Sequence, residues 1–325
     1  MSRNKHGNSI HLHILDTPQE MAAVEELQRL IWPGTETEIV PAHMLLAAAH
    51  NGGLVIGAYQ ISMPFGDTST ESLVNVVAGE MPQGASLVGF VFSFPGIYTT
   101  PDGPRLKHHS HMMGVLPEFR DQGIGFALKR AQWQMVRHQG IDRITWTFDP
   151  LISRNAYLNI AQLGAVCNIY LREVYGKMRD QLNIGLTTDR FQVDWWVNSC
   201  RVSRRLSKRS RLQLDLAHFL AAGLNIVNPT QINADGLPQP VSITQLDSLF
   251  QNIPSNDTSM LLVEIPADFQ SLKVADLALA LEWRTHTRLL FEELFRFGFM
   301  ATDFVYLPGA YPRSFYVFSN GERTL

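Results

Sequence analysis

The stretch over residues 115–128 reads VLPEFRDQGIGFAL, and it decides how the N-terminal part of this chain folds. A strand is predicted over residues 107–115 just before it, and an amphipathic helix is predicted over residues 126–138. Gly123 and Gly125 allow a ligand to approach the backbone closely, and the first turn of the helix offers N–H groups that favour phosphate. The stretch therefore predicts either a phosphate-binding turn or an ordinary tight turn between a strand and a helix.

The spacing of the glycines excludes two common phosphate-binding motifs. A dinucleotide-binding fold would need a third glycine at position 128, which is Leu128, and a P-loop needs a Gly-Lys-Ser/Thr sequence that this stretch does not contain. What remains is R-x-x-G-x-G over residues 120–125, with Val115-x-Pro117 before it. The combined pattern resembles the pyrophosphate-binding motif of the GNAT acetyltransferase superfamily.

The resemblance to this superfamily covers residues 9–198 and implies an α/β (α+β) GNAT fold, with a mixed central sheet flanked by helices. It implies acetyl-CoA as the co-substrate and no metal. The resemblance also implies that the pyrophosphate is held by Arg120, Asp121, Gln122, Gly123, Ile124 and Gly125. The pantetheine arm would pair with the backbone of Met113, Gly114 and Val115, and Asn155 would contact coenzyme A unless it only caps a helix.

The N-terminal part as a whole has the order of elements of a mixed α/β layer architecture. Strands are predicted over residues 9–15, 54–59, 86–94, 107–115, 143–148, 166–171 and 191–197. Helices are predicted over residues 17–30, 41–49, 126–138 and 153–163. Residues 63–85 form a polar, irregular stretch that is long for a connection and is expected to border the acceptor pocket.

Three histidines occur on the strand that leads into the glycine turn. Strand alternation predicts His109, His111 and Met113 on one face and His108 on the other, unless a bulge at Gly114 resets the alternation. A neutral imidazole suits the removal of an ammonium proton near neutral pH, so His111 first and His109 second are the candidates for the general base. Their spacing resembles the paired histidines of serotonin N-acetyltransferase. A packing role is the alternative.

The general acid that would protonate the leaving thiolate is harder to assign. GNAT enzymes often carry a tyrosine three residues before the Leu-Gly that ends this helix, and that position is Ile160 here. Tyr157, one turn earlier, is the candidate substitute, with packing as the alternative. Asn155 and Asn159 are four residues apart and are expected on one helix face. Asp149 could orient the start of this helix or face the substrate.

The residue composition changes near residue 200, where a domain boundary is predicted. The two predicted domains are an acetyltransferase domain over residues 1–200 and an α/β subdomain over residues 201–325 that packs on the core or completes it. Residues 201–211 contain six basic side chains, which could contact nucleic acid or the 3′-phosphate of coenzyme A, although a solvated linker face is expected. Further on, the sequence predicts a strand at 260–265, a helix at 274–297, and strands at 300–307 and 315–318.

Three further stretches narrow the resemblance. WTFDPL (residues 146–151), RNAYLNIAQLGA (residues 154–165) and VEIPADFQ (residues 263–270) resemble a family of large GNAT acetyltransferases of undefined substrate. The resemblance implies an N-acetyltransferase that transfers an acetyl group directly to a small amine. A transferase that uses another acyl-CoA, and a non-catalytic module that binds acyl-CoA, are the alternatives.

Composition excludes several other classes of protein. With 45% hydrophobic and 18% charged residues among 325, the chain is not disordered, and its apolar runs are too short for a membrane span. Two cysteines make no disulfide framework and no signal peptide is visible, so a soluble cytoplasmic protein is expected. The net charge of −3 gives no reason to expect a nucleic-acid partner. A homodimer is expected only from the habit of the superfamily.

Overall fold

The computed structural model describes residues 8–34, 36–62, 76–77, 84–176, 185–207, 214–242 and 260–320. The chain forms two compact units, residues 1–144 and residues 145–325, and the division falls inside strand β6 (Arg143–Phe148). Both units combine strands and helices in layers, which confirms the predicted α/β class. The domain boundary near residue 200 stays a prediction.

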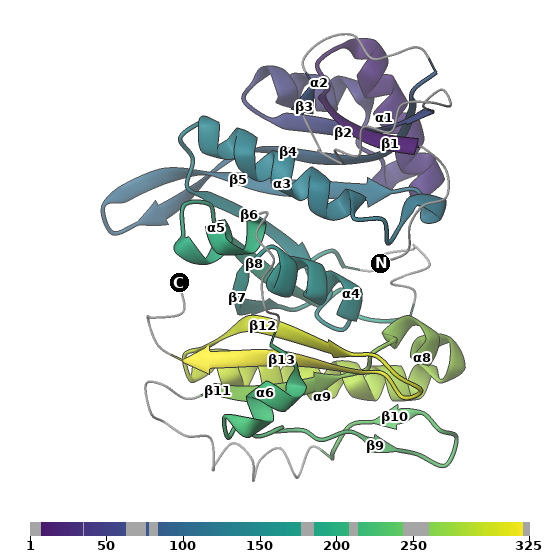
Figure 1. The fold of residues 1–325 in the computed structure, drawn as a ribbon, viewed down its shortest axis with the longest axis vertical. Coiled ribbons are helices and arrows are strands. Elements are labelled where there is room, and N and C mark those ends of the chain that lie inside the picture. The colour runs from purple at the N-terminus through teal and green to yellow at the C-terminus, as the bar shows by residue number, and fades with distance from the viewer. Residues whose placement is uncertain are drawn as a thin grey trace. The chain divides into compact units, whose positions relative to one another are not determined.

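Unit 1 is a mostly antiparallel sheet with helices on both faces (Figure 1). Its strand order is β3-β1-β2-β4-β5. These strands are β1 (Asn8–Ile14), β2 (Leu54–Ser62), β3 (Val76–Val77), β4 (Ser86–Thr100) and β5 (Gly103–Val115). The sequence did not predict β3, which joins β1 in parallel; residues 63–75 and 78–83 around it lie outside the described residues. The other pairs of neighbouring strands are antiparallel.

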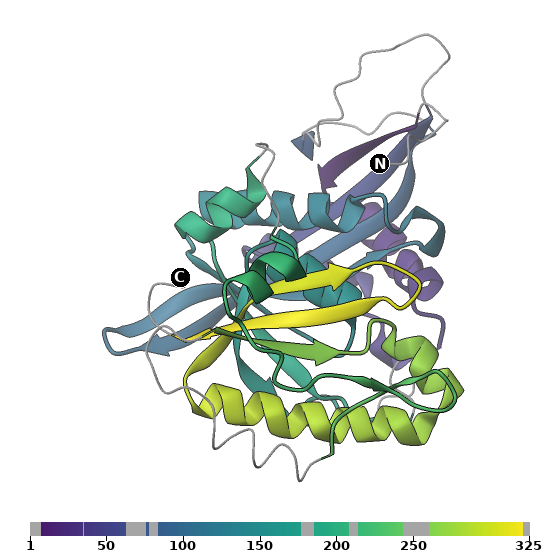
Figure 2. The ribbon, with the colours of Figure 1, turned by 60° about the horizontal axis from the view of Figure 1, so that its bottom comes forward.

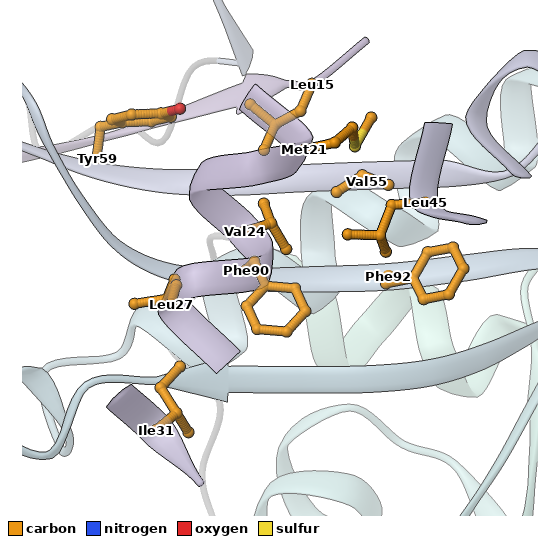
Figure 3. Packing of buried hydrophobic residues seen from close by; sticks show 10 residues of the cluster. All are labelled: Leu15, Met21, Val24, Leu27, Ile31, Leu45, Val55, Tyr59, Phe90 and Phe92. Carbon is orange, nitrogen blue, oxygen red and sulfur yellow. The ribbon is translucent and has the colours of Figure 1, made fainter. Parts of the chain in front are cut away.

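Helices α1 (Pro18–Ile31) and α2 (Ala42–His50) cover one face of this sheet, and α3 (Ile124–His138) covers the other. Thr17 starts α1 with a capping box, in which Glu20 N–H donates to the threonine hydroxyl and Thr17 N–H donates to the glutamate carboxylate. The buried side of α1 then packs on α2, β2 and β4. Figure 3 shows this cluster, formed by Leu15, Met21, Val24, Leu27, Ile31, Leu45, Val55, Tyr59, Phe90 and Phe92.

Unit 2 contains a second run of strands, in the order β6-β8-β7-β12-β13-β11. They are β7 (Val166–Leu171), β8 (Arg190–Trp196), β11 (Met260–Ile265), β12 (Phe299–Leu307) and β13 (Arg313–Asn320), together with β6. Helix α9 (Leu277–Arg296) lies along one face and α6 (Leu216–Ala221) on the other (Figure 2). The alternation of β13 explains this, because Tyr316 and Phe318 contact Phe291 of α9 while Phe315 and Val317 pack with α6.

The remaining elements of unit 2 are short. They are α4 (Ser153–Ala156), a π-helical turn (Tyr157–Gln162), α5 (Cys200–Leu206), α8 (Phe269–Ala275) and the pair β9 (Gln231–Ile232) and β10 (Pro238–Gln239). The helix predicted at 274–297 is α9, which begins three residues later than expected, and the short helix α8 before it was not predicted. The reason is Asp276, which is extended and accepts a hydrogen bond from the N–H of Leu279, so that a new helix starts there.

Residues beyond 200 pack against residues 145–200 of the same unit. Strand β12 pairs with β7 at Ala301 and Cys167. Arg201 Nε donates to Gly164 O at 2.9 Å, and Arg205 forms an ion pair with Asp303 at 2.7 Å. The expected solvated linker face is therefore wrong for these two arginines, because the carbonyl groups that end a helix attract them. Residues 208–211 of the basic run lie outside the described residues.

Candidate functional site

The two histidines predicted as the base lie at a bulge in the β4–β5 ladder. Phe92 pairs with Met112 and Ser93 pairs with Ser110, so His111 is the extra residue on β5. The sequence analysis considered a bulge at Gly114, but the register shifts at His111 instead. A bulge re-aims the side chains next to it, and such irregularities are frequent beside active sites.

His109 and His111 share a face with two phenylalanines of β4. The ring centroids of His109 and Phe94 are 5.4 Å apart, and those of His111 and Phe92 are 5.9 Å apart. The two imidazole rings are 6.1 Å from each other. The predicted grouping of His109 with His111 is confirmed, and both lie on the side of the sheet that carries α1 and α2.

Met113 is on the opposite face, which corrects the sequence-based alternation. It packs with Val91, Ile124 and Leu128 against α3, whereas Met112 packs on the α1 side. The bulge at His111 is the cause, because one extra residue reverses the faces of everything after it. His108 lies on the α3 face as predicted and is fully buried, with its Nδ1 3.1 Å from Ser93 Oγ.

The pKa values of both candidate bases are lowered. Burial first, and then the charges of His111, Lys107 and Lys129, lower the pKa of His109 to about 4. Part of His111 remains exposed, but loss of solvent around its imidazole, beside Phe92, lowers its pKa as well. Both rings are therefore neutral at neutral pH and free to accept a proton.

The glycine turn follows β5 directly and opens α3. Arg120 Nε donates to Val115 O at 3.1 Å, which folds the turn back on the end of the strand. Asp121 and Gly123 both have positive φ, +62° and +81°. Gly123 is the N-cap of α3, and as a glycine it has no side chain that could cap this helix start. The first-turn N–H groups of α3 are thus available to an anion.

The turn residues differ in what they can offer to a ligand. Arg120, Asp121, Gln122 and Gly123 are exposed. Gln122 Nε2 donates to Glu118 O at 3.1 Å, which holds its side chain over the turn. Ile124 is buried in the α3 cluster, and Gly125 has no side chain, so these two can contribute only backbone groups.

Gly123 allows a test of this turn. A residue with a side chain at φ +81° is strained by about 1–2 kcal/mol, although nothing lies within 4 Å of the added carbon. We expect Gly123→Ala to raise the Kd for acetyl-CoA about tenfold, because the strain distorts the first turn of α3. Gly140→Ala, at the far end of the same helix with φ +74° and equally open space, is the matched control and should leave the Kd unchanged. Equal Kd values for both variants in calorimetric titrations would exclude a role for the turn.

Gly114 has a structural reason of its own. A carbon added there would lie 2.8 Å from both Ile31 and Trp32, so only glycine lets the end of α1 come this close to β5. Neighbouring Val115 pairs with Gly89 of β4. The predicted contact of Met113, Gly114 and Val115 with pantetheine stays a prediction.

Asn155 and Tyr157 belong to unit 2, and their place is described within that unit. Asn155 is exposed on α4, and Tyr157 is half-buried at the start of the π-helical turn. Asn159, by contrast, is buried. The expectation that it shares a helix face with Asn155 stays a prediction. Ile160 is fully buried, as expected of a packing residue at the position where GNAT enzymes often carry tyrosine.

Asp149 organises the approach to α4. Its Oδ1 accepts the N–H of Leu151 at 2.9 Å, and both carboxylate oxygens accept hydrogen bonds from Arg284 of α9, at 2.9 and 2.5 Å. Of the two roles considered for Asp149, orienting the start of the helix is the one supported by these contacts.

Sequence reasoning missed a set of buried polar side chains between β5 and α3. Lys129 and Gln132 of α3 both bond to Ser110 of β5. The signal that could have found them is their spacing, because positions 125, 129, 132 and 136 form a stripe beside the apolar face of the helix.

Among the described residues, no group of three or more His, Cys, Asp or Glu side chains could hold a metal ion. In the same described ranges, no helix has the length and apolar character needed to cross a membrane.

Comparison with known proteins finds solved structures that are similar to part of this chain. No protein-family model and no curated protein sequence matches the chain. Among solved structures, it is similar to a GNAT-family protein from Desulfovibrio desulfuricans (14% identity, 58% of this chain and 99% of that chain, TM-score 0.38). It is also similar to Arabidopsis thaliana NAA60 in complex with acetyl-CoA (15%, 59% and 100%, TM-score 0.42). A third is the Escherichia coli ribosomal-protein-S18-alanine N-acetyltransferase (12%, 63% and 99%, TM-score 0.38).

Proposed function

We propose that this protein is an acetyl-CoA-dependent N-acetyltransferase that acts on a small amine by direct transfer. The observation that carries the proposal is the continuous segment from β5 through the glycine turn into α3. It presents two neutral histidines at a bulge on the strand and an uncapped helix start a few residues later. This arrangement supports the proposal because it would join a base for an amine and a cradle for a pyrophosphate in one continuous segment.

The histidines supply the proton acceptor of the proposed reaction. His111, or His109 beside it, takes a proton from the ammonium form of the acceptor. The freed nitrogen lone pair attacks the thioester carbonyl, the C–N bond forms, and the C–S bond breaks. The proton that remains on the new amide nitrogen is lost, and the coenzyme A thiolate leaves and takes up a proton. Tyr157 remains our candidate for the donor of that last proton.

The turn holds the other end of the co-substrate. The first-turn N–H groups of α3 and the Arg120 side chain would bind the pyrophosphate, with the positive end of the helix dipole favouring its charge. Asn155 is our further candidate for a coenzyme A contact. Acetyl-CoA itself supplies the activated acetyl group, and the residues named here bind and orient it.

One observation favours a second candidate, a non-catalytic module that binds acyl-CoA. The position of the usual GNAT acid is Ile160, which is fully buried and has no ionisable group. Such a module would need the turn but neither the histidine pair nor Tyr157. A transferase that uses another acyl-CoA is a further alternative, because no residue of the turn would distinguish one acyl group from another.

The lowered histidine pKa values predict the pH dependence of the reaction. A base must be neutral to act, so activity falls as the pH drops through its pKa in the free enzyme. We expect the acid limb of kcat/KM to have its midpoint below 6.5, the ordinary value for histidine, and near 4 if His109 is the base. A midpoint above 6.5 in the pH–rate profile would contradict these assignments.

The proposed function is tested by binding and turnover together. Acetyl-CoA binding is measured by calorimetry, and release of the coenzyme A thiol is followed over a broad panel of small amines. Turnover above that of a His109→Ala/His111→Ala variant supports the transferase. Binding without such turnover supports the module, and absence of binding contradicts both.

A further inference from the structure

One buried lysine of unit 1 has no part in the proposed reaction. Lys129, on the second turn of α3, is 2% exposed, although lysine is almost never fully buried unless it is paired. Its Nζ donates to Ser110 Oγ at 2.8 Å and to Gln132 Oε1 at 3.1 Å. Gln132 Nε2 donates to the same serine hydroxyl at 3.1 Å. The three side chains form a closed polar triangle between α3 and β5.

Packing does not explain this triangle. Leu128 and Ala131 fill the adjacent part of the interface with apolar atoms, and a methionine at position 129 would do the same. Burial lowers the pKa of the Lys129 amine well below its usual range, so the charged form of this amine costs stability at this position. Buried polar networks that are kept at such a cost commonly fix one geometry among several.

The geometry that Ser110 fixes is the bulge. Ser110 pairs with Ser93 and is the last regularly paired residue before His111. Its side chain faces α3, while His109 and His111 on either side of it face the phenylalanines of β4. A slip of one residue in this ladder would turn the histidines towards α3 and Ser110 away from it. Two donors from one helix, both bound to the Ser110 hydroxyl, oppose that slip.

We propose that Lys129 is a positioning residue that holds Ser110 against α3 and so keeps the bulge in the register that presents His109 and His111. Helix α3 also begins at the glycine turn, so one helix would position both the proposed base and the proposed pyrophosphate site. The importance of this positioning for catalysis rests on the proposed acetyl transfer, but the positioning itself does not.

Lys107 provides a matched control for the charge of Lys129. The charged and titratable groups that act on His109 are His111 and Lys107 on its own strand and Lys129 on α3; His108 is next to it on the opposite face. Lys107→Met and Lys129→Met each remove one lysine amine from the surroundings of His109. Only Lys129→Met also removes a hydrogen bond to Ser110.

The kinetic test compares these two variants with Ser110→Ala, which removes the acceptor of the triangle. We expect Lys129→Met and Ser110→Ala to lower kcat by about tenfold to 10²-fold, because small misplacements of a catalytic group have effects of this size. The KM for acetyl-CoA should stay within about twofold, and Lys107→Met should leave kcat within about threefold of the wild type. Wild-type kcat in both Lys129→Met and Ser110→Ala would overturn the proposal.

An NMR measurement on the histidine rings tests the positioning without any activity. In the wild type, contacts between the rings of His111 and Phe92 and of His109 and Phe94 should be observed. In folded Lys129→Met and Ser110→Ala, we expect these contacts to weaken, while Lys107→Met keeps them and only raises the pKa of His109. Unchanged ring contacts in the first two variants would overturn the positioning role. A wild-type protein that shows the ring contacts but transfers no acetyl group would contradict the proposed function alone.

Discussion

Replacement of His111 by glutamine is expected to lower kcat/KM for acetyl transfer by about 10²- to 10⁴-fold, the range that general bases contribute. Glutamine fills much of the same space beside Phe92 and Phe94 but cannot accept a proton at neutral pH. Binding of acetyl-CoA should be unchanged, because the glycine turn is separate from the bulge. Steady-state rates of thiol release, together with calorimetric Kd values, measure the two effects independently.

His109→Gln distinguishes the two candidates for the base. If His111 is the base, His109→Gln should have a smaller effect, because it removes only a neighbouring ring 6.1 Å away. His50→Gln, on an exposed histidine at the end of α2, is the control and should change nothing. A His111→Gln variant with the wild-type rate would remove His111 from the mechanism, and the larger loss in His109→Gln would then assign the base to that residue.

Arg284→Ala should lower the free energy of unfolding by about 3–5 kcal/mol, as expected when one partner of a buried ion pair is removed. The Arg284 and Asp149 side chains are 3% and 13% exposed and form two hydrogen bonds with each other. The variant removes both of these hydrogen bonds and leaves the poorly hydrated Asp149 carboxylate only the more distant guanidinium of Arg190, at 3.9 Å. Urea unfolding followed by circular dichroism measures the loss as a shift of the midpoint.

Two further variants separate the ion pair from its surroundings. Arg284→Met/Asp149→Asn should recover much of the lost stability, because no buried charge is left unpaired and the Leu151 N–H keeps an acceptor. Arg296→Met, on the same helix, breaks an exposed pair with Glu293 and should change the stability by only about 0–1 kcal/mol. Equal losses in Arg284→Ala and Arg296→Met would mean that burial of the pair contributes nothing.

Local patterns in the sequence predicted much of unit 1. Apart from β3, the strands and helices up to residue 138 follow from apolar periodicity, and Thr17, Pro18 and Glu20 mark the start of α1 by capping chemistry alone. The glycine turn was recognisable because Gly123 needs a positive φ and because a strand and a helix flank it. The grouping of His109 with His111 followed from the period of a strand. These features depend on neighbours in sequence, so the sequence alone was enough.

Other features depend on contacts between distant residues. The bulge at His111 depends on pairing with β4, a separate strand, and no pattern within β5 predicts it. It nevertheless reverses the face on which Met113 lies. Ion pairs such as Arg284 with Asp149 join residues 135 positions apart, and no local pattern connects them.

The sequence by itself therefore determined the α/β class, the turn that would hold a pyrophosphate and the strand that carries the candidate base. Only the tertiary structure decided which way the side chains around the bulge point and which polar groups are buried behind them. The physical reason is that register and desolvation are properties of two packed segments. A slip of one residue in the register moves every side chain of a strand to the opposite face. Lys129 loses contact with water only because α3 packs against β5, and that burial is what lowers its pKa.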